Sequence, residues 1–324
     1  IVAIPEAGEL QSDTMAEMVT GMAFLQTILP HLQVNSAALT LPSILDTILI
    51  LPIKTIRKDS HQLMLTEQDL RQGLQTRSFG RKIYSFDLID STNECAKALA
   101  NCSAAEGTIV FAEQQTAGRG RFGREWTADP NENLTFSIIL RPELNPDSTQ
   151  LLPLYVAVAV AEAVEESSGM TVECKWPNDL LVGGRKIAGF LLEASTRQNK
   201  LDFVVLGVGI NVNQTRFPES IGEKATSLKN ASGKSLDRAS LFRTVVKALE
   251  DHYARFSSSG FESVVSQWLS RSSMLNRKIS VSMHGAPVSG IVKGLSREGG
   301  LILQTGGEER VLFAGDVSIL EGYS

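Results

Sequence analysis

Cysteine and histidine are scarce in this chain of 324 residues, which holds three cysteines and four histidines. Cys95, Cys102 and Cys174 are odd in number, and neither they nor the histidines show the spacing of a metal-binding motif. This pattern argues against a disulfide-stapled secreted domain and favours free thiols in a reducing compartment. We therefore expect a cytoplasmic protein, and the sequence identifies no metal ligands.

Lysine and arginine are absent from residues 15–53, a mostly apolar segment that three prolines interrupt. Its apolar run at 41–53 is shorter than the about 20 residues that cross a bilayer. A DNA-binding helix-turn-helix needs a basic face, and this segment has none. The first residues also lack the basic region of a secretory signal. We predict an N-terminal extension of unknown role over residues 1–62, with neither DNA nor a membrane as partner.

The overall charge is mildly negative. The net charge is −5, with 43% apolar and 21% charged residues. This composition is typical of a soluble enzyme with a large core and predicts one to three domains. An acidic chain is not a general nucleic-acid binder, although a local basic loop is compatible with it.

Residues 118–126, GRGRFGREW, are the most informative stretch. Glycine lets the backbone approach a ligand, arginine offers permanently charged donors, and tryptophan offers a face on which a base can stack. The glycines satisfy the dinucleotide pattern G-x-G-x-x-G, but a Rossmann loop opens a helix, whereas turn-forming residues follow Trp126. We expect a loop that wraps a nucleotide and an acid; the alternative is a solvated basic loop.

A second segment, at residues 175–189, reads KWPND and then GGRKIAG. A two-residue glycine turn predicts a hairpin that brings Asp179 and Lys186 onto neighbouring strands. A lysine fixed there is well placed to hold an acyl or phosphoryl oxygen. The alternative is a surface hairpin with ordinary charges.

A third segment, at residues 206–213, places two glycines inside a predicted strand. Gly207 and Gly209 share one face with Asn211, because side chains alternate along a strand. Glycine within a strand often marks the close approach of a ligand, so we expect room for a flat ligand against bare backbone. Close packing against a helix is the alternative.

Hydrophobic periodicity predicts alternating strands and helices from residue 81 onward. Strands are expected at residues 83–89, 108–112, 134–140, 172–176, 187–194 and 203–212. Helices are expected at 95–99, behind a capping box that begins at Ser91, and at 151–166, 239–256 and 261–269. Short runs at 279–283, 288–292, 300–304 and 310–313 predict a small β-barrel.

Taken in order, these motifs resemble those of the biotin protein ligase family. The family's D-S-T-N, G-R-G-R-x-G-R-x-W, K-W-P-N-D with G-R-K-x-A-G, and G-[IV]-G-I-N appear at residues 90–93, 118–126, 175–179 with 184–189, and 207–211. The resemblance covers roughly residues 66–322, including GDVS at 315–318. Residues 1–62 match nothing in the family, which indicates the monofunctional type with a C-terminal SH3-like domain.

The resemblance implies an α+β fold. A mixed sheet flanked by helices, like that of class II aminoacyl-tRNA synthetases, would occupy residues 63–274, and an SH3-like barrel residues 275–324. The implied reaction uses biotin, ATP and Mg²⁺ to make biotinyl-5′-AMP, then transfers biotin to a lysine of a biotin carboxyl carrier protein or domain. The resemblance also admits a homodimer.

The family's site residues carry over by position. The resemblance implies catalytic roles for Lys186, Arg121 and Asp179, of which Asp179 would orient Lys186, assist the metal or help deprotonate the incoming lysine. It implies biotin contacts from Ser91, Thr92, Asn93, Gln115, Arg119, Gly120, Arg121, Lys186, Gly189, Gly207 and Gly209. It implies ATP contacts from Arg121, Arg124, Trp126, Lys186 and Asn211, with Trp126 stacked on adenine and Asn211 bonded to its edge.

Two other readings of the motifs stay open. Lipoate ligases share the fold and the chemistry, but the arginine loop that ends in Trp126 favours biotin. A repressor that uses biotinyl-AMP as corepressor needs a DNA-binding domain with a basic face, and residues 15–53 do not supply one.

Overall fold

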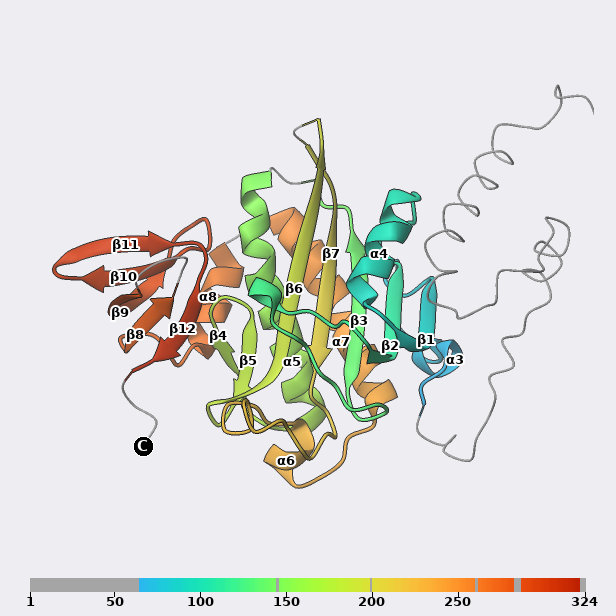
Figure 1. Cartoon of the computed structure of the whole chain (residues 1–324). Helices are drawn as coiled ribbons and strands as arrows, with labels where there is room; N and C mark the ends of the chain where they lie inside the picture. Colours follow the sequence, from blue (N-terminus) through green and yellow to red (C-terminus); the bar gives the residue numbers. More distant parts are fainter. Residues whose placement is uncertain (1–63, 144–145, 199, 260–261, 283–286, 321–324) are drawn as a thin grey trace, which may run out of the picture.

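Two β-sheets organise the chain in the computed structural model, which describes residues 64–143, 146–198, 200–259, 262–282 and 287–320 (Figure 1). The predicted extension at 1–62 lies outside these residues. The larger sheet has seven strands in the order β1-β2-β3-β7-β6-β5-β4. These strands are β1 (Ile83–Ile89), β2 (Ile109–Gln115), β3 (Leu134–Leu140), β4 (Glu173–Lys175), β5 (Asp179–Val182), β6 (Arg185–Arg197) and β7 (Lys200–Ile210).

One parallel pair makes this sheet mixed, as the sequence predicts. β1 pairs with β2 in parallel, and every other ladder in the sheet is antiparallel. Parallel neighbours need a crossover, and α4 (Thr92–Asn101) supplies it. Strand β2 continues three residues beyond the predicted end and delivers Gln115 to the edge where α4 begins.

Helices cover both faces of the large sheet. On β2, Phe111 lies in the same buried cluster as α5 (Leu152–Ser168) and α7 (Arg238–Ser259), whereas its neighbour Val110 lies in the cluster of α4. This alternation is the period-two pattern of a strand that is buried on both sides. The predicted strands therefore lie inside the molecule rather than on its surface.

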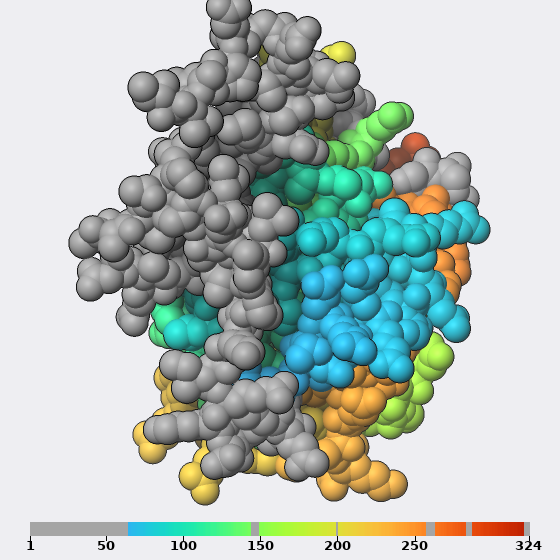
Figure 2. Space-filling view, turned by 90° about the vertical axis from the view of Figure 1, so that its right-hand side faces the viewer, coloured from blue at the N-terminus to red at the C-terminus, as the bar shows by residue number. Residues whose placement is uncertain are grey.

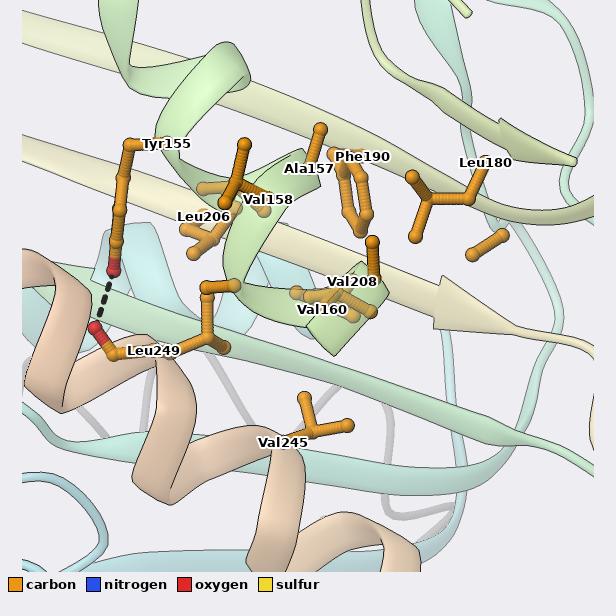
Figure 3. Packing of buried hydrophobic residues seen from close by; sticks show 14 of the residues in the cluster. Tyr155, Ala157, Val158, Val160, Leu180, Phe190, Leu206, Val208, Val245 and Leu249 are labelled. Carbon is orange, nitrogen blue, oxygen red and sulfur yellow. Dashed lines mark hydrogen bonds between the residues drawn. The ribbon is translucent and has the colours of Figure 1, made fainter. Parts of the chain in front are cut away.

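Helix α5 is apolar on all sides because it lies between the sheet and α7. Its residues 154–161 are all buried, and Pro153 stands in its first turn, where a missing N–H costs nothing. Figure 3 shows the Tyr155 hydroxyl, which donates to the Leu249 carbonyl at 2.8 Å. Gly169 ends the helix in the left-handed region at φ 70°.

A buried ion pair fixes the first described residues. Arg238 donates to both carboxylate oxygens of Glu113 at 2.7 and 3.1 Å, and the two side chains are only 5% and 2% exposed. The same carboxylate accepts the N–H of Leu65 at 2.6 Å. Figure 2 shows this side of the molecule, where α3 (Glu67–Arg71) and β1, in blue and cyan, lie beside orange α7.

The second sheet has five antiparallel strands in the order β11-β10-β9-β8-β12. They are β8 (Lys278–Ser282), β9 (Val288–Leu295), β10 (Leu301–Thr305), β11 (Glu308–Leu312) and β12 (Asp316–Ile319). The sequence predicts the first four; the fifth comes from the GDVS segment. The indole N–H of Trp176 donates to the Gly299 carbonyl at 3.2 Å and so joins the two sheets.

The remaining elements are short or connect the sheets. They are α6 (Leu228–Ser232), α8 (Glu262–Arg271) and the 3₁₀ turns η3 (Arg121–Gly123) and η4 (Pro146–Leu151). Among the described helices, none combines the length and apolar composition that a bilayer crossing requires.

Candidate active site

A pocket of about 420 Å³ opens where the three sequence motifs meet. It lies at the end of β2, over the β6–β7 hairpin, and beneath the arginine loop at residues 118–126. Every site residue expected from the sequence lines it: Ser91, Thr92, Asn93, Gln115, Arg119, Gly120, Arg121, Arg124, Trp126, Asp179, Lys186, Gly189, Gly207, Gly209 and Asn211.

The beginning of α4 forms a polar end of the pocket. Ser91 is the N-cap, and its hydroxyl accepts the N–H of Glu94 at 3.5 Å. The predicted capping box is wrong in its second half: the N–H of Ser91 donates to Asp90 at 2.6 Å, and the Glu94 carboxylate pairs with Lys97 instead. Asp90 takes the place of Glu94 as the acceptor for the Ser91 N–H, and Lys97 binds the Glu94 carboxylate, so the second hydrogen bond of the capping box does not form.

Gln115 has a fixed orientation in this region. The backbone N–H and the hydroxyl of Thr92 both donate to Gln115 Oε1, at 2.7 and 3.0 Å. A backbone N–H can only donate, so the atom facing it must be the amide oxygen. The Gln115 NH₂ group therefore points away, toward Gly118 and the pocket.

The strand glycines do not leave bare backbone, which corrects the prediction. A Cβ at Gly207 would stand 2.3 Å from the Asn93 amide oxygen, and one at Gly209 would stand 2.3 Å from the Trp126 ring. Protein side chains thus occupy the space that the sequence assigns to a ligand. The glycines permit close approach as expected, but in this state the approaching groups are Asn93 and Trp126.

Lys186 and Asp179 meet across the predicted hairpin. The turn residues Gly183 and Gly184 have φ of 55° and 74°, the left-handed values of a tight hairpin turn. Lys186 Nζ lies 2.6 Å from Asp179 Oδ1 and 5.6 Å from the centre of the Trp126 ring. The carboxylate therefore holds the ammonium group beside the aromatic face at the centre of the pocket.

The arginine loop reaches the small sheet. Arg121 Nη1 donates to the Gly315 carbonyl at 3.3 Å and to Asn178 Oδ1 at 3.4 Å, and Arg124 pairs with Asp316. Burial lowers the pKa of Arg121, against the attraction of Asp316 and Asp179. The loop opens a three-residue 3₁₀ turn and not an α-helix, which agrees with rejecting the dinucleotide pattern.

The side chain of Asn211 is partly used in a hydrogen bond to a neighbouring loop. Its side-chain NH₂ donates to the Thr226 carbonyl at 3.1 Å, and its backbone N–H donates to Ile187. One of the two amide hydrogens of Asn211 is therefore already bonded within the protein.

Sequence reasoning missed several pocket residues. Lys175, Asn178 and Asp316 stand inside quoted motifs but carried no assigned role. Burial lowers the pKa of Lys175, opposed by the charge of Asp179. Phe217 and Ile221 also line the pocket from a connection that has no sequence signal.

Family models match two parts of the chain. The biotin/lipoate A/B protein ligase family matches residues 85–211, and the biotin protein ligase C-terminal domain matches residues 274–320. The bifunctional ligase/repressor BirA of Bacillus subtilis is 33% identical over 274 residues, which are 82% of this chain and 84% of that protein. The chain belongs to the biotin protein ligase family.

Other relatives agree. The biotin–[acetyl-CoA-carboxylase] ligase of Mycobacterium tuberculosis is 32% identical over 78% of this chain and 95% of that protein. A solved biotin protein ligase from Aquifex aeolicus, in complex with biotin and ATP, aligns with a TM-score of 0.65 and 31% identity, over 75% of this chain and 100% of that chain. The predicted fold and the predicted class of enzyme, a biotin–protein ligase, are confirmed.

Proposed function

We propose that this chain converts biotin and ATP to biotinyl-5′-AMP and pyrophosphate, and then transfers biotin to a lysine of a biotin carboxyl carrier protein or carboxylase domain. The observation that carries the proposal is the convergence of all the family motifs on one pocket. Cations, an aromatic face and an oriented amide group line this pocket, and these are the groups that both substrates need.

The first step brings a carboxylate toward an α-phosphate, so two negative groups must be neutralised. Lys186 and Arg121 both line the pocket, and Asp179 fixes the first of them at 2.6 Å. A carboxylate oxygen of biotin attacks the α-phosphorus, and pyrophosphate leaves. Such preorganised charge is often the largest contribution to catalysis.

ATP would lie between Trp126 and the arginine loop. Arg124 would hold its phosphates after leaving Asp316, and Trp126, in its place over Gly209, would stack on adenine. Mg²⁺ needs only one or two protein carboxylates when it arrives on a nucleotide. The pocket offers Asp179 and Asp316 for this role, although the described residues contain no cluster of three metal-ligating side chains. The ion would neutralise phosphate charge.

Biotin would take the other end of the pocket. Ser91, Thr92 and the Gln115 NH₂ group present hydroxyl and amide groups to its ureido ring, with Asn93 and Gly207 beneath. Arg119 and Gly120 would contact it mainly through backbone atoms, and Gly189 leaves room for Lys186, whose Nζ would lie 2.8 Å from a Cβ at this position.

The second step needs no enzyme nucleophile. The ε-amine of the acceptor lysine attacks the acyl carbon, AMP leaves, and the amine loses a proton. The ion pair with Lys186 supports an orienting role for Asp179. No nucleophile–base pair is needed in the motifs, because the adenylate is the activated species.

We also infer a monofunctional, cytoplasmic ligase. The absence of lysine and arginine from residues 15–53 supports a chain without a DNA-binding face, although relatives at 33% identity bear the name ligase/repressor. A homodimer is compatible with this role. The free cysteines Cys95, Cys102 and Cys174 support a reducing compartment.

Incubation with biotin, ATP, Mg²⁺ and an acceptor domain tests the proposed function. We expect pyrophosphate release with biotin alone, and covalent label on the acceptor lysine when the domain is present. An acceptor in which that lysine is replaced by arginine is the matched control. Equal turnover with lipoate in place of biotin would assign the chain to the lipoate branch, and no pyrophosphate release with either acid would refute the proposal.

A further inference from the structure

A charged pair lies directly behind the proposed biotin end of the pocket. Lys97 on α4 and Glu193 on β6 approach to 2.5 Å between Nζ and Oε1, and neither residue lines the pocket. The other carboxylate oxygen of Glu193 accepts the side-chain NH₂ of Asn93 at 2.7 Å. Asn93 does line the pocket, so the pair is one residue removed from the proposed substrate.

We propose that Glu193, held by Lys97, is a positioning residue that sets the orientation of the Asn93 amide and with it the hydrogen-bond pattern offered to biotin. The inference rests on the proposed function, because it takes biotin as the ligand at this end of the pocket. It gives a role in recognition to two residues that do not touch the ligand.

Glu193 can fix the amide because an ionised carboxylate only accepts hydrogen bonds. The Asn93 group facing it must therefore be NH₂, and the amide oxygen must face the other way. That oxygen lies 2.6 Å from the Ser137 hydroxyl and rests on the backbone of Gly207. The Leu191 carbonyl, at 3.4 Å from the same NH₂ group, is a longer second acceptor.

Lys97 holds the Glu193 carboxylate in place. Burial acts to lower the pKa of Lys97, but its hydrogen bonds to Glu193 and Glu94 outweigh burial and raise it. The side chains of Lys97 and Glu193 are 27% and 32% exposed, so water reaches them only in part. The ammonium group therefore stays charged opposite Glu193.

The orientation of Asn93 passes to the rest of the pocket through Ser137. Ser137 is fully buried, and its one hydroxyl proton is donated in a hydrogen bond to the Asn93 amide oxygen. Toward Thr92, at 2.8 Å, Ser137 can then only accept, so Ser137 and Gln115 Oε1 compete for the one hydroxyl proton of Thr92. If Asn93 turned over, its NH₂ group would face Ser137, the Ser137 proton would turn to Thr92, and the Thr92 proton would be left to Gln115 alone.

The test compares biotin affinity, measured by calorimetry without ATP, with the steady-state constants. For Glu193→Ala we expect Kd and KM for biotin to rise about tenfold, the effect of losing a hydrogen bond to a charged group. KM for ATP should stay within about twofold, because its proposed contacts lie at the other end. Asp202→Asn removes another carboxylate on the same hairpin, one that pairs with Arg141 and Arg197 outside the pocket, and it should change neither constant.

A charge exchange separates positioning from stability. In the double variant Lys97→Glu with Glu193→Lys, the ion pair is restored, but the ammonium group at position 193 cannot accept from Asn93. We expect a Tm near that of the wild type and a biotin Kd that stays raised. A wild-type Kd in the double variant or in Glu193→Ala would overturn the inference alone. Wild-type protein that binds no biotin would overturn the proposed function and this inference together.

Discussion

Lys186 is the residue on which the proposed chemistry depends most directly. It is the cation that Asp179 holds beside Trp126, in the centre of the pocket. For Lys186→Ala we expect pyrophosphate release to fall by three orders of magnitude or more, about 4 kcal/mol, because a charge-stabilising donor is lost.

The matched control for this variant is Lys247→Ala. Lys247 pairs with Asp251 on the outer part of α7, away from the proposed site. The Lys247→Ala variant should release pyrophosphate at the wild-type rate, and circular dichroism should show that both variants are folded. Release by Lys186→Ala within a few-fold of wild type would contradict the assigned role.

Gly209 tests the position of Trp126. A methyl group at residue 209 would overlap the Trp126 ring, whose buried indole N–H has no hydrogen-bond partner among the described residues. For Gly209→Ala we expect the ring to be displaced, the KM for ATP to rise about tenfold or more, and the Trp126 fluorescence to shift to the red. Gly222→Ala is the matched control, because it adds a methyl group at ordinary contact distance. Gly233→Ala would not serve, because Gly233 has φ 74°, which strains any residue with a side chain.

A change in biotin affinity with an unchanged KM for ATP would contradict this account of Gly209. The same result would place the adenine elsewhere in the pocket. Trp126→Phe keeps an aromatic face and should retain most of the ATP affinity, since stacking does not need the indole N–H.

At the level of elements, the loop at residues 118–126 is the part expected to change with ligand. Three like charges lie on it, and its contacts with the small sheet are an exposed ion pair at Arg124 and a 3.3 Å hydrogen bond at Arg121. Exposed pairs stabilise by at most about 1 kcal/mol. We expect trypsin to cut after Arg119, Arg121 or Arg124 in the free enzyme, and ligand to suppress the cut.

Asp316→Asn sharpens the loop experiment. Without the carboxylate, Arg124 loses its ion pair, so cleavage of the free enzyme should be faster while protection by biotin and ATP persists. Equal cleavage of the wild type with and without ligand would show that the loop is not a gate.

The secondary structure was largely predictable because each main element has a simple period. The sequence predicts the bounds of the β1 and β3 strands to the residue, and the glycine turn predicts the β5–β6 hairpin. The side chains that pack on Gly207 and Gly209 could not be predicted. Asn93 reaches Gly207 and Arg124 reaches Asp316 across more than a hundred residues, and no local pattern encodes such contacts.

The sequence predicts which residues line the site, but not the contacts that they make with one another. Motif resemblance brings fifteen residues to one pocket, and all of them line it. Glu193 and Lys97 carry no motif of their own, since a charged residue on a strand or helix reads as a solvated face. Their importance comes from distances, which only the fold provides.

At the level of the whole molecule, the described ligase fold is anchored from Leu65 onward. The N–H of Leu65 binds the buried Glu113 carboxylate, and Leu70 on α3 is fully buried. We therefore expect a chain starting at Met64 to fold and to biotinylate an acceptor like the full chain. A chain starting at Gly73 lacks both contacts and should lose several degrees of Tm.

The same pair of chains tests the monofunctional proposal. The 324-residue chain with biotin and ATP should show no salt-sensitive binding to a biotin-operon operator, because residues 15–53 offer no cations for phosphate. Nanomolar operator binding at physiological salt would refute it. Insolubility of the chain from Met64 would show instead that residues 1–63 complete the core.

The hydrogen bond from Trp176 to Gly299 has a consequence for how the protein comes apart. A Cβ at Gly299 would stand 2.7 Å from Leu151, so the small sheet rests directly on the start of α5, the most buried helix of the large one. Trp176 and Leu151 are both buried at this contact, so we expect the two sheets to unfold together. Scanning calorimetry should therefore record one heat-absorption peak for both sheets. On heating, biotin adenylation and biotin transfer should be lost at the same temperature, because the C-terminal sheet unfolds together with the large one.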